Sequence, residues 1–151
     1  MTSKPYRVLF LCSGNSARSQ MAEALVNHFL APRWEARSAG TSPAGYVHPL
    51  AVRVMEELGI SMAGHYSKHV SDIKDLNSFD IAITLCDEAC EACSVWLGGP
   101  PRTHIGFPDP AAVQGTEEER LAVFRQVRDD IRRRIFAFLE EWERKRAGES
   151  S

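Results

Sequence analysis

The residues best suited to chemistry are Cys12 and Arg18, which are separated by five small or polar residues. A β-favouring run precedes them and a helical pattern begins at Ser19, so they flank a loop that joins a strand to a helix. Backbone N–H groups in such a loop point inward, and the helix N-terminus adds roughly half a positive charge. The loop can therefore hold a tetrahedral oxyanion, and its field favours a nucleophilic thiolate at Cys12.

Individual residues of the loop support this interpretation. Gly14 adopts positive φ at little cost and Asn15 tolerates it better than most residues. Arg18 offers a planar fork for two anion oxygens, and Ser19 could donate a hydrogen bond to the sulfur of Cys12. We expect the oxyanion-binding residues to be Ser13, Gly14, Asn15, Ser16, Ala17, Arg18 and Ser19.

A carboxylate follows near the other end of the chain. Asp109 stands between Pro108 and Pro110, which restrict the backbone and remove two N–H donors. Such a stiff turn can aim the carboxyl group at a bound substrate. We therefore predict that Asp109 is the general acid that protonates the leaving oxygen.

Three further cysteines, Cys86, Cys90 and Cys93, lie close together in the sequence. The only early apolar run, residues 8–11, is too short for a signal peptide, so we expect a cytoplasmic protein. Structural disulfides rarely persist in a reducing cytosol, and these cysteines are therefore candidates for chemistry. Together with His104 they could instead bind zinc, although their spacing is not a standard paired motif.

Hydrophobic patterns predict alternating strands and helices. The expected strands are Arg7–Leu11, Trp34–Ala39, Phe79–Leu85 and Thr103–Phe107. One helix is expected from Ser19 and a second over Pro49–Leu58. A last helix is expected to begin at a capping box formed by Thr116 and Glu119. In the last helix the expected apolar stripe is Leu121, Phe124, Val127, Ile131, Ile135, Phe138 and Trp142. The alternation implies an α/β fold with a parallel sheet, in which ligands bind at the carboxyl ends of the strands.

Composition restricts the remaining classes. With 151 residues we expect one domain over 1–151, with a tail that frays from about residue 147. The net charge of −2 provides no field to attract nucleic acid, and no run of about 18 apolar residues predicts a membrane span. We expect a monomer.

The sequence resembles arsenate reductases built on the low-molecular-weight tyrosine phosphatase fold. The matching segments are Val8–Ala24, Ser38–Gly40, Ile83–Cys86, Phe107–Pro110 and the last helix. The resemblance implies a three-layer α/β/α fold with a four-stranded parallel sheet. It also implies reduction of arsenate to arsenite for arsenic detoxification. Because phosphate has the shape and charge of arsenate, we expect it to compete for the loop.

In the thioredoxin-coupled members of this family, thiols that match Cys86 and Cys93 carry a redox relay. The resemblance implies that Cys12 attacks arsenate, Cys86 attacks Cys12 as arsenite leaves, and Cys93 then attacks Cys86. An external thiol system, either thioredoxin or glutaredoxin with glutathione, would reduce the final disulfide, and no bound cofactor or metal is expected. Cys90 is an alternative resolving thiol, because a helical step of four residues would place it about 6 Å from Cys86.

Two other functions remain open. A tyrosine phosphatase would need only Cys12, Arg18 and Asp109, although Ala111 stands where related phosphatases commonly have an aromatic residue. A non-enzymatic oxyanion-binding or redox-sensing module would need no turnover at all.

The resemblance also implies part of a potassium site. Asn15, Glu23 and Ser38 match potassium ligands of some of these reductases, but the fourth position is Lys68. The ammonium could replace the ion, so we predict no potassium requirement. We interpret His28, His48, His65, His69 and His104 as packing or surface residues.

Overall fold

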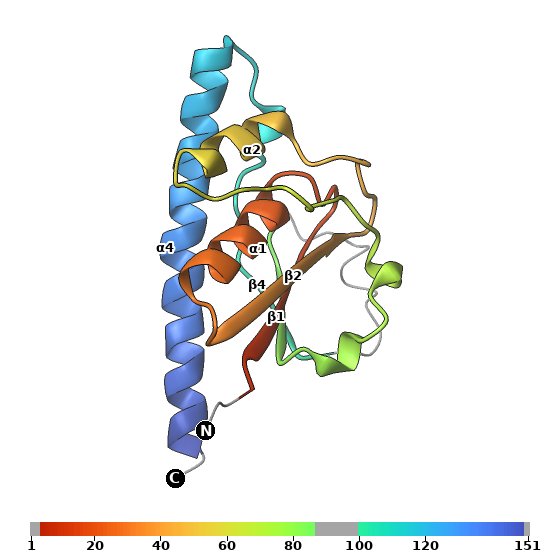
Figure 1. The fold of residues 1–151 in the computed structure, drawn as a ribbon, viewed down its shortest axis with the longest axis vertical. Coiled ribbons are helices and arrows are strands. Elements are labelled where there is room, and N and C mark those ends of the chain that lie inside the picture. The colour runs from red at the N-terminus through yellow and green to blue at the C-terminus, as the bar shows by residue number, and fades with distance from the viewer. Residues whose placement is uncertain (1–3, 87–99, 150–151) are drawn as a thin grey trace.

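A computed structural model of the chain describes residues 4–86 and 100–149 (Figure 1). The elements follow one another as β1 (Tyr6–Cys12), α1 (Arg18–Phe29), β2 (Trp34–Gly40), α2 (Pro49–Glu56), β3 (Ile81–Thr84), β4 (Arg102–His104) and α4 (Glu117–Glu149). Three short 3-10 turns, η1 (Val70–Asp72), η2 (Leu76–Ser78) and η3 (Pro110–Ala112), lie in the connections. The predicted alternation of strands and helices is confirmed.

The four strands form one parallel sheet in the order β2-β1-β3-β4. The prediction for the last strand was wrong at its end, because β4 stops at His104 rather than at Phe107. Beyond His104, the N–H groups of Ile105 and Phe107 donate to the carbonyls of Thr84 and Leu85. Between these two hydrogen bonds the segment after β4 advances by two residues, whereas the segment after β3 advances by one. This difference breaks the regular ladder.

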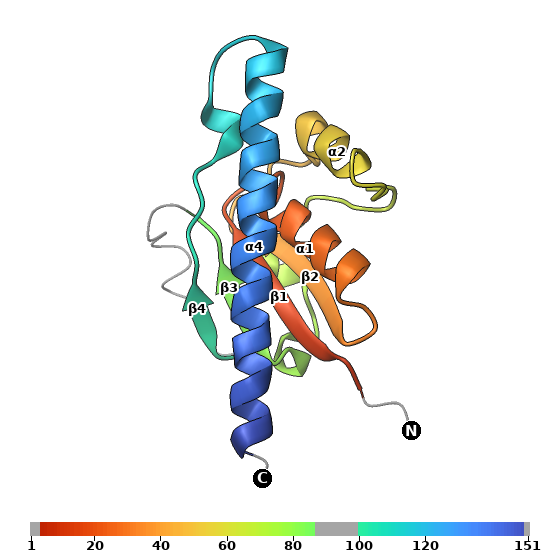
Figure 2. The same cartoon turned by 90° about the vertical axis from the view of Figure 1, so that its left-hand side faces the viewer.

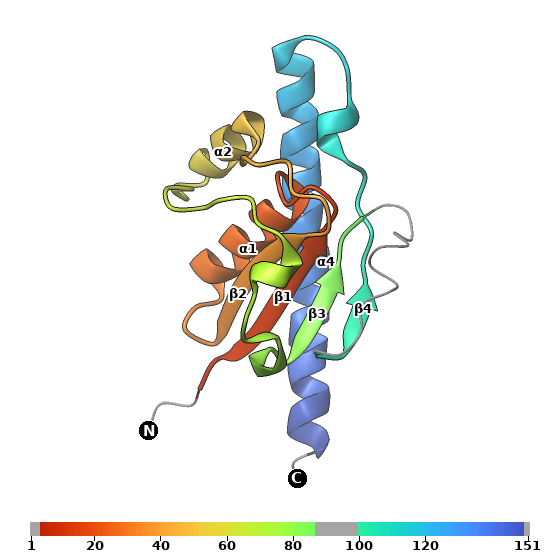
Figure 3. The ribbon, with the colours of Figure 1, turned by 90° about the vertical axis from the view of Figure 1, so that its right-hand side faces the viewer.

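The two faces of the sheet are covered differently (Figures 2 and 3). Val8, Phe10 and Cys12 on β1 pack into the larger core, to which α1, α2 and α4 contribute. Leu9 and Leu11 point to the other face, where the described cover comes from residues in and around η1 and η2. Among residues 4–86 and 100–149, the second outer layer of the expected three-layer fold is therefore made of short 3-10 turns rather than a long helix.

Helix α4 begins at the predicted capping box. The hydroxyl of Thr116 accepts from the N–H of Glu119 at 3.1 Å, and the carboxylate of Glu119 accepts in return from the N–H of Thr116 at 3.3 Å. The apolar stripe is confirmed from Leu121 to Ile135. Beyond Ile135 the stripe continues through Leu139, which is fully buried, rather than through Phe138, which is only partly buried. The helix ends at Glu149.

No helix in the described part of the chain is both long enough and apolar enough to cross a lipid bilayer.

The carboxyl end of β2 lies directly against the loop that follows β1. A Cβ atom at Gly40 would lie 2.6 Å from the carbonyl oxygen of Ser13, 2.9 Å from that of Cys12 and 3.0 Å from Cβ of Asn15. Backbone oxygens cannot move aside as a flexible side chain can. Glycine at this position therefore allows the sheet edge to support the loop closely.

We predict that Gly40→Ala destabilises the protein by about 1–3 kcal/mol, as overpacking typically does, and weakens binding of phosphate. Chemical denaturation would measure the free energy of unfolding, and calorimetry would measure phosphate binding. As a stability control, Gly14→Ala adds a Cβ with contacts no closer than 3.9 Å. Equal stability of Gly40→Ala and the wild type would contradict the close approach.

Candidate active site

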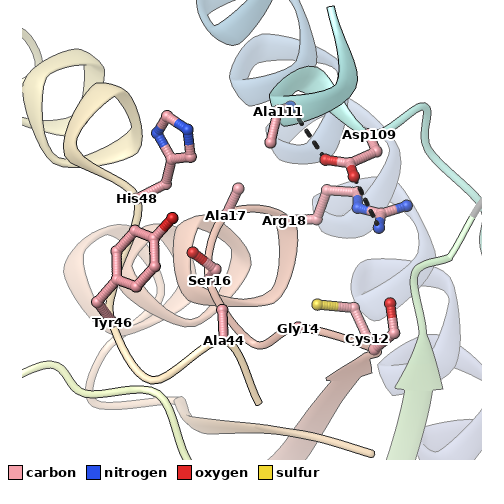
Figure 4. A pocket seen from close by; sticks show the side chains of 11 residues that line it. Cys12, Gly14, Ser16, Ala17, Arg18, Ala44, Tyr46, His48, Asp109 and Ala111 are labelled. Atoms are coloured by element: carbon pink, nitrogen blue, oxygen red, sulfur yellow. Dashed lines mark hydrogen bonds and ion pairs between the residues drawn. The ribbon is translucent and has the colours of Figure 1, made fainter. Parts of the chain in front are cut away.

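The loop of residues 12–17 and the start of α1 form the floor of a cavity of about 200 Å³ (Figure 4). Cys12 ends β1 with 2% of its surface exposed, and Arg18 begins α1 with 7% exposed. Both line the cavity, together with Ser13, Gly14, Ser16 and Ala17. The structure therefore brings the candidate nucleophile, the guanidinium group and most of the predicted anion loop to one concave surface. Asn15 and Ser19 lie behind it, both fully buried.

The sulfur of Cys12 is 2.9 Å from the hydroxyl oxygen of Ser19. That oxygen also accepts a hydrogen bond from Nδ2 of Asn15 at 2.9 Å. Since Asn15 supplies the hydrogen in that contact, the hydroxyl hydrogen of Ser19 is left for the sulfur. A donor aimed at sulfur stabilises the charged thiolate more than the neutral thiol, which is the form that a nucleophile needs.

Asn15 carries the unusual backbone conformation of the loop. Its φ is 46°, whereas Gly14, which we also expected to allow positive φ, is outside that region. The side-chain oxygen of Asn15 accepts from Nε2 of Gln20 at 3.0 Å and from the N–H of Lys68 at 2.9 Å. These bonds fix the strained residue from two separate segments of the chain.

Arg18 connects the floor to the candidate general acid. Its Nη1 donates to the carbonyl of Phe107 at 3.0 Å, and its Nη2 lies 3.9 Å from Oδ2 of Asp109. The other carboxylate oxygen of Asp109 accepts from the N–H of Ala111 at 3.0 Å, which caps η3 and orients the group. The predicted carboxylate therefore lines the cavity within reach of the anion loop.

Sequence reasoning missed the opposite wall, formed by Ala44, Tyr46 and His48. Figure 4 shows Tyr46 and His48 across the cavity from Asp109 and Ala111. His48 caps α2, since its Nδ1 accepts from the N–H of Leu50 at 3.1 Å. No local motif marks these residues as part of a site. The sequence indicated only that a helix begins after His48, because the proline that follows it is typical of the first turn of a helix.

The capping role of His48 depends on its protonation state. Burial is the main cause that lowers the pKa of His48 from its ordinary value of 6.5; Arg120 lowers it further, and Asp109 opposes the shift. The folded protein therefore holds His48 neutral, with Nδ1 available as an acceptor. Below pH 6.5 the unfolded chain takes up a proton that the folded chain resists, so folding stability contributed by this residue is lost as the pH falls.

We predict that His48→Asn reduces the loss of unfolding free energy between pH 7 and pH 5. Asparagine keeps an oxygen acceptor for the helix cap but does not titrate. Denaturant unfolding of both proteins at the two pH values would measure this. An equal decrease in the two proteins would contradict the assigned effect.

Cys12 ends β1, and Cys86 follows the end of the neighbouring strand β3 by two residues. Leu11 is paired with Thr84, and the N–H of Leu85 donates to the carbonyl of Leu11 at 2.8 Å. Both thiols are buried and belong to the same core cluster. Cys90 and Cys93 lie outside the described residues.

The proposed zinc alternative depends on those undescribed cysteines. Among the described residues, no group of three or more potential metal ligands is found. His104, the fourth residue of that alternative, has its Nδ1 2.7 Å from the hydroxyl of Thr84.

Behind the loop, Lys68 lies where the resemblance would place a potassium ligand. Its Nζ is 4.0 Å from Oε1 of Glu23 and donates to the carbonyl of Tyr66 at 3.3 Å, while the hydroxyl of Ser38 donates to the same Glu23 oxygen at 2.9 Å. Burial lowers the pKa of Lys68, Glu23 opposes that shift, and Arg37 adds to it. A cation is therefore already built into the chain at this position, and the residues do not fit a potassium site.

We predict that activity and melting temperature are the same in potassium chloride and sodium chloride at constant ionic strength. The ammonium of Lys68 supplies the positive charge that Glu23 faces, so a potassium ion would add nothing. Higher activity or a higher melting temperature in potassium would contradict this prediction.

Comparison with known proteins places these observations in a family context. The family model described as low molecular weight phosphotyrosine protein phosphatase matches residues 7–148. A protein of Shouchella clausii named arsenate reductase is 44% identical over 136 residues, which cover 90% of this chain and 96% of that protein.

Two solved structures are also similar. The crystal structure of an arsenate reductase from Archaeoglobus fulgidus aligns with a TM-score of 0.66 and 32% identity, over 83% of this chain and 96% of that one. A thioredoxin-dependent arsenate reductase from Corynebacterium glutamicum aligns with a TM-score of 0.66 and 25% identity, over 93% of this chain and 65% of that one.

Proposed function

We propose, from the premise that this chain belongs to the low molecular weight phosphotyrosine protein phosphatase family, that it is an arsenate reductase. The observation that carries the proposal is the pairing of an anion loop around Cys12 with a second buried thiol, Cys86, at the same edge of the sheet. Hydrolysis of a phosphate ester transfers no electrons and therefore does not require a second thiol. The arsenate reductase of Shouchella clausii, 44% identical over most of its length, supports reduction over phosphate ester hydrolysis.

The first step forms a bond between sulfur and arsenic. The loop amides and Arg18 hold arsenate over Cys12, and the thiolate attacks the arsenic atom. One arsenic–oxygen bond breaks, and Asp109 gives its proton to the oxygen, which leaves as water. Arsenic remains pentavalent, because no electron pair has yet been transferred to it.

The second step transfers the electrons. The thiolate of Cys86 attacks the sulfur of Cys12, so that a disulfide forms while the sulfur–arsenic bond breaks. The electron pair of that bond stays on arsenic, which becomes trivalent and leaves as arsenite. The two thiols thus supply two electrons, and their burial in the same core cluster at the ends of neighbouring strands supports this transfer.

The third step regenerates Cys12. We propose that Cys93 attacks Cys86, with Cys90 as the alternative thiol, and that an external thiol protein reduces the resulting disulfide. The similarity to a thioredoxin-dependent arsenate reductase supports thioredoxin over glutaredoxin with glutathione. The scheme needs no bound cofactor, operates in the cytoplasm and requires only one copy of the chain.

The same geometry predicts how phosphate behaves. The floor of the cavity recognises a tetrahedral oxyanion through backbone N–H groups and Arg18, none of which distinguishes arsenic from phosphorus. Phosphate therefore binds in the place of arsenate without being reduced.

We predict distinct outcomes for the cysteine variants in an arsenate-dependent NADPH oxidation assay coupled separately to thioredoxin and to glutaredoxin with glutathione. Cys12→Ser, Cys86→Ser and Cys93→Ser lose steady turnover, whereas Cys90→Ser keeps it. Without a reductant, Cys93→Ser still releases about one arsenite per protein molecule, because Cys12 and Cys86 suffice for one turnover; Cys86→Ser releases none. Arsenite is quantified directly after a single turnover.

Other outcomes would identify the alternatives. Hydrolysis of an aryl phosphate by Cys86→Ser and Cys93→Ser, with no arsenite formed by the wild type, would indicate a phosphatase. Tight phosphate binding with neither activity, whichever thiol donor is supplied, would indicate a binding or sensing module. Loss of turnover in Cys90→Ser, but not in Cys93→Ser, would make Cys90 the resolving thiol.

A further inference from the structure

A histidine outside the cavity contacts the hydrogen-bonded network behind the anion loop. We propose that His65 is a positioning residue for this loop, which acts through the amide of Gln20 on Asn15. The inference rests on the oxyanion site proposed above but not on electron transfer between thiols. His65 does not line the cavity, so it acts on the bound anion only through other residues.

The ring nitrogen Nδ1 of His65 faces two oxygen atoms. Oε1 of Gln20 and Oε2 of Glu23 each lie 3.1 Å from it. The carbonyl-type oxygen of Gln20 can only accept, and an ionised carboxylate can only accept as well. Nδ1 must therefore carry the hydrogen, which fixes His65 as the donor to Gln20 whether or not the second ring nitrogen is protonated.

The orientation of the Gln20 amide follows from its other contacts. Its Nε2 is 3.1 Å from the backbone oxygen of Asn15, 3.0 Å from the side-chain oxygen of Asn15 and 2.9 Å from the carbonyl of Tyr66. If the amide were reversed, its oxygen would face three acceptors and its nitrogen would face the donor His65. The donor His65 at Oε1 and the three acceptor oxygens at Nε2 therefore favour the same orientation of the Gln20 amide.

If the Gln20 amide lost this orientation, the oxygen atoms of Asn15 would lose the donor Nε2. Both Gln20 and Asn15 are fully buried, so an oxygen left without a donor cannot be satisfied by bulk water. Asn15 also holds a φ of 46°, a conformation that residues with a side chain rarely adopt and that its hydrogen bonds to Gln20 and Lys68 hold in place. Its Nδ2 in turn binds Ser19, whose hydroxyl contacts the sulfur of Cys12. The contacts therefore lead from His65 to the nucleophile without a break.

Glu23 holds the ring of His65 in place. One of its oxygens lies 3.1 Å from Nδ1 of the ring, while the other accepts from the hydroxyl of Ser38 and faces Lys68. The side chain of His65 is 17% exposed and that of Glu23 is 13% exposed. The donor is thus directed by a mostly buried carboxylate rather than by solvent.

The test compares His65→Asn with His65→Leu in the reduced full-length protein. The two replacements have almost the same shape, but only asparagine places a nitrogen donor at the position of Nδ1, two bonds from Cβ. Calorimetry at pH 7 would measure the dissociation constant for inorganic phosphate. Mass spectrometry would follow the rate at which iodoacetamide alkylates Cys12.

We expect His65→Leu to weaken phosphate binding about five- to tenfold, as the loss of one buried hydrogen bond of about 1 kcal/mol or slightly more predicts, and to slow Cys12 alkylation. His65→Asn should stay within about twofold of the wild type by the same reasoning. His69→Leu is the matched control: it removes a histidine that caps η1 in the same loop, where Nδ1 accepts from the N–H of Ser71. It should leave both measurements unchanged.

A double-mutant cycle tests the route through Gln20. In a Gln20→Ala background, His65→Leu should add no further loss, because the residue through which it acts is gone. Additive losses, equal losses in His65→Asn and His65→Leu, or unchanged phosphate binding in His65→Leu would each overturn the proposal. If His65→Leu does not fold, full binding by His65→Asn supports the donor role, and a tenfold loss in His65→Asn overturns it.

If phosphate binding and alkylation follow these expectations while no arsenite is ever produced, the positioning role stands and the proposed reductase activity fails. The reverse pattern, arsenite production with phosphate binding insensitive to His65, would reject only the positioning role.

Discussion

In the proposed reaction, a thiolate and a doubly charged oxyanion approach each other to within bonding distance in this cavity. At about 4 Å and an effective dielectric constant of about 20, their repulsion amounts to about 8 kcal/mol. That cost exceeds any single hydrogen bond. The chain offers several contributions at once: the guanidinium of Arg18, the positive end of α1, and the loop residues Ser13, Gly14, Ser16 and Ala17 that line the cavity.

Concentrating donors in this way has structural consequences behind the loop. The backbone must turn sharply at Asn15, where φ is positive, and the turn is held by buried amide groups rather than by apolar packing. Gly40 lets the neighbouring strand come close enough to support it. The layer beneath contains Glu23, His65 and Lys68, so the site rests on a second set of polar groups that face one another.

The parallel sheet solves a separate problem, which is to bring a second thiol to the first. Cys12 and Cys86 are far apart in the sequence, but each follows the end of a central strand, and β1 and β3 are neighbours. Both thiols are buried in the same core cluster. The fold thus combines an anion site and a pair of thiols at a single edge.

The sequence by itself determined the strands, the helices, the anion loop and the roles expected of Cys12, Arg18 and Asp109, because these depend on neighbours within a few residues. Only the tertiary structure decided that His48 forms a cavity wall and that His65 contacts Gln20. His48 lies across the cavity from Asp109, and His65 contacts Gln20, so each meets a residue that is distant in the sequence and that no local periodicity encodes. The early end of β4 has the same origin, because it depends on how the partner strand advances rather than on the residues of β4 itself.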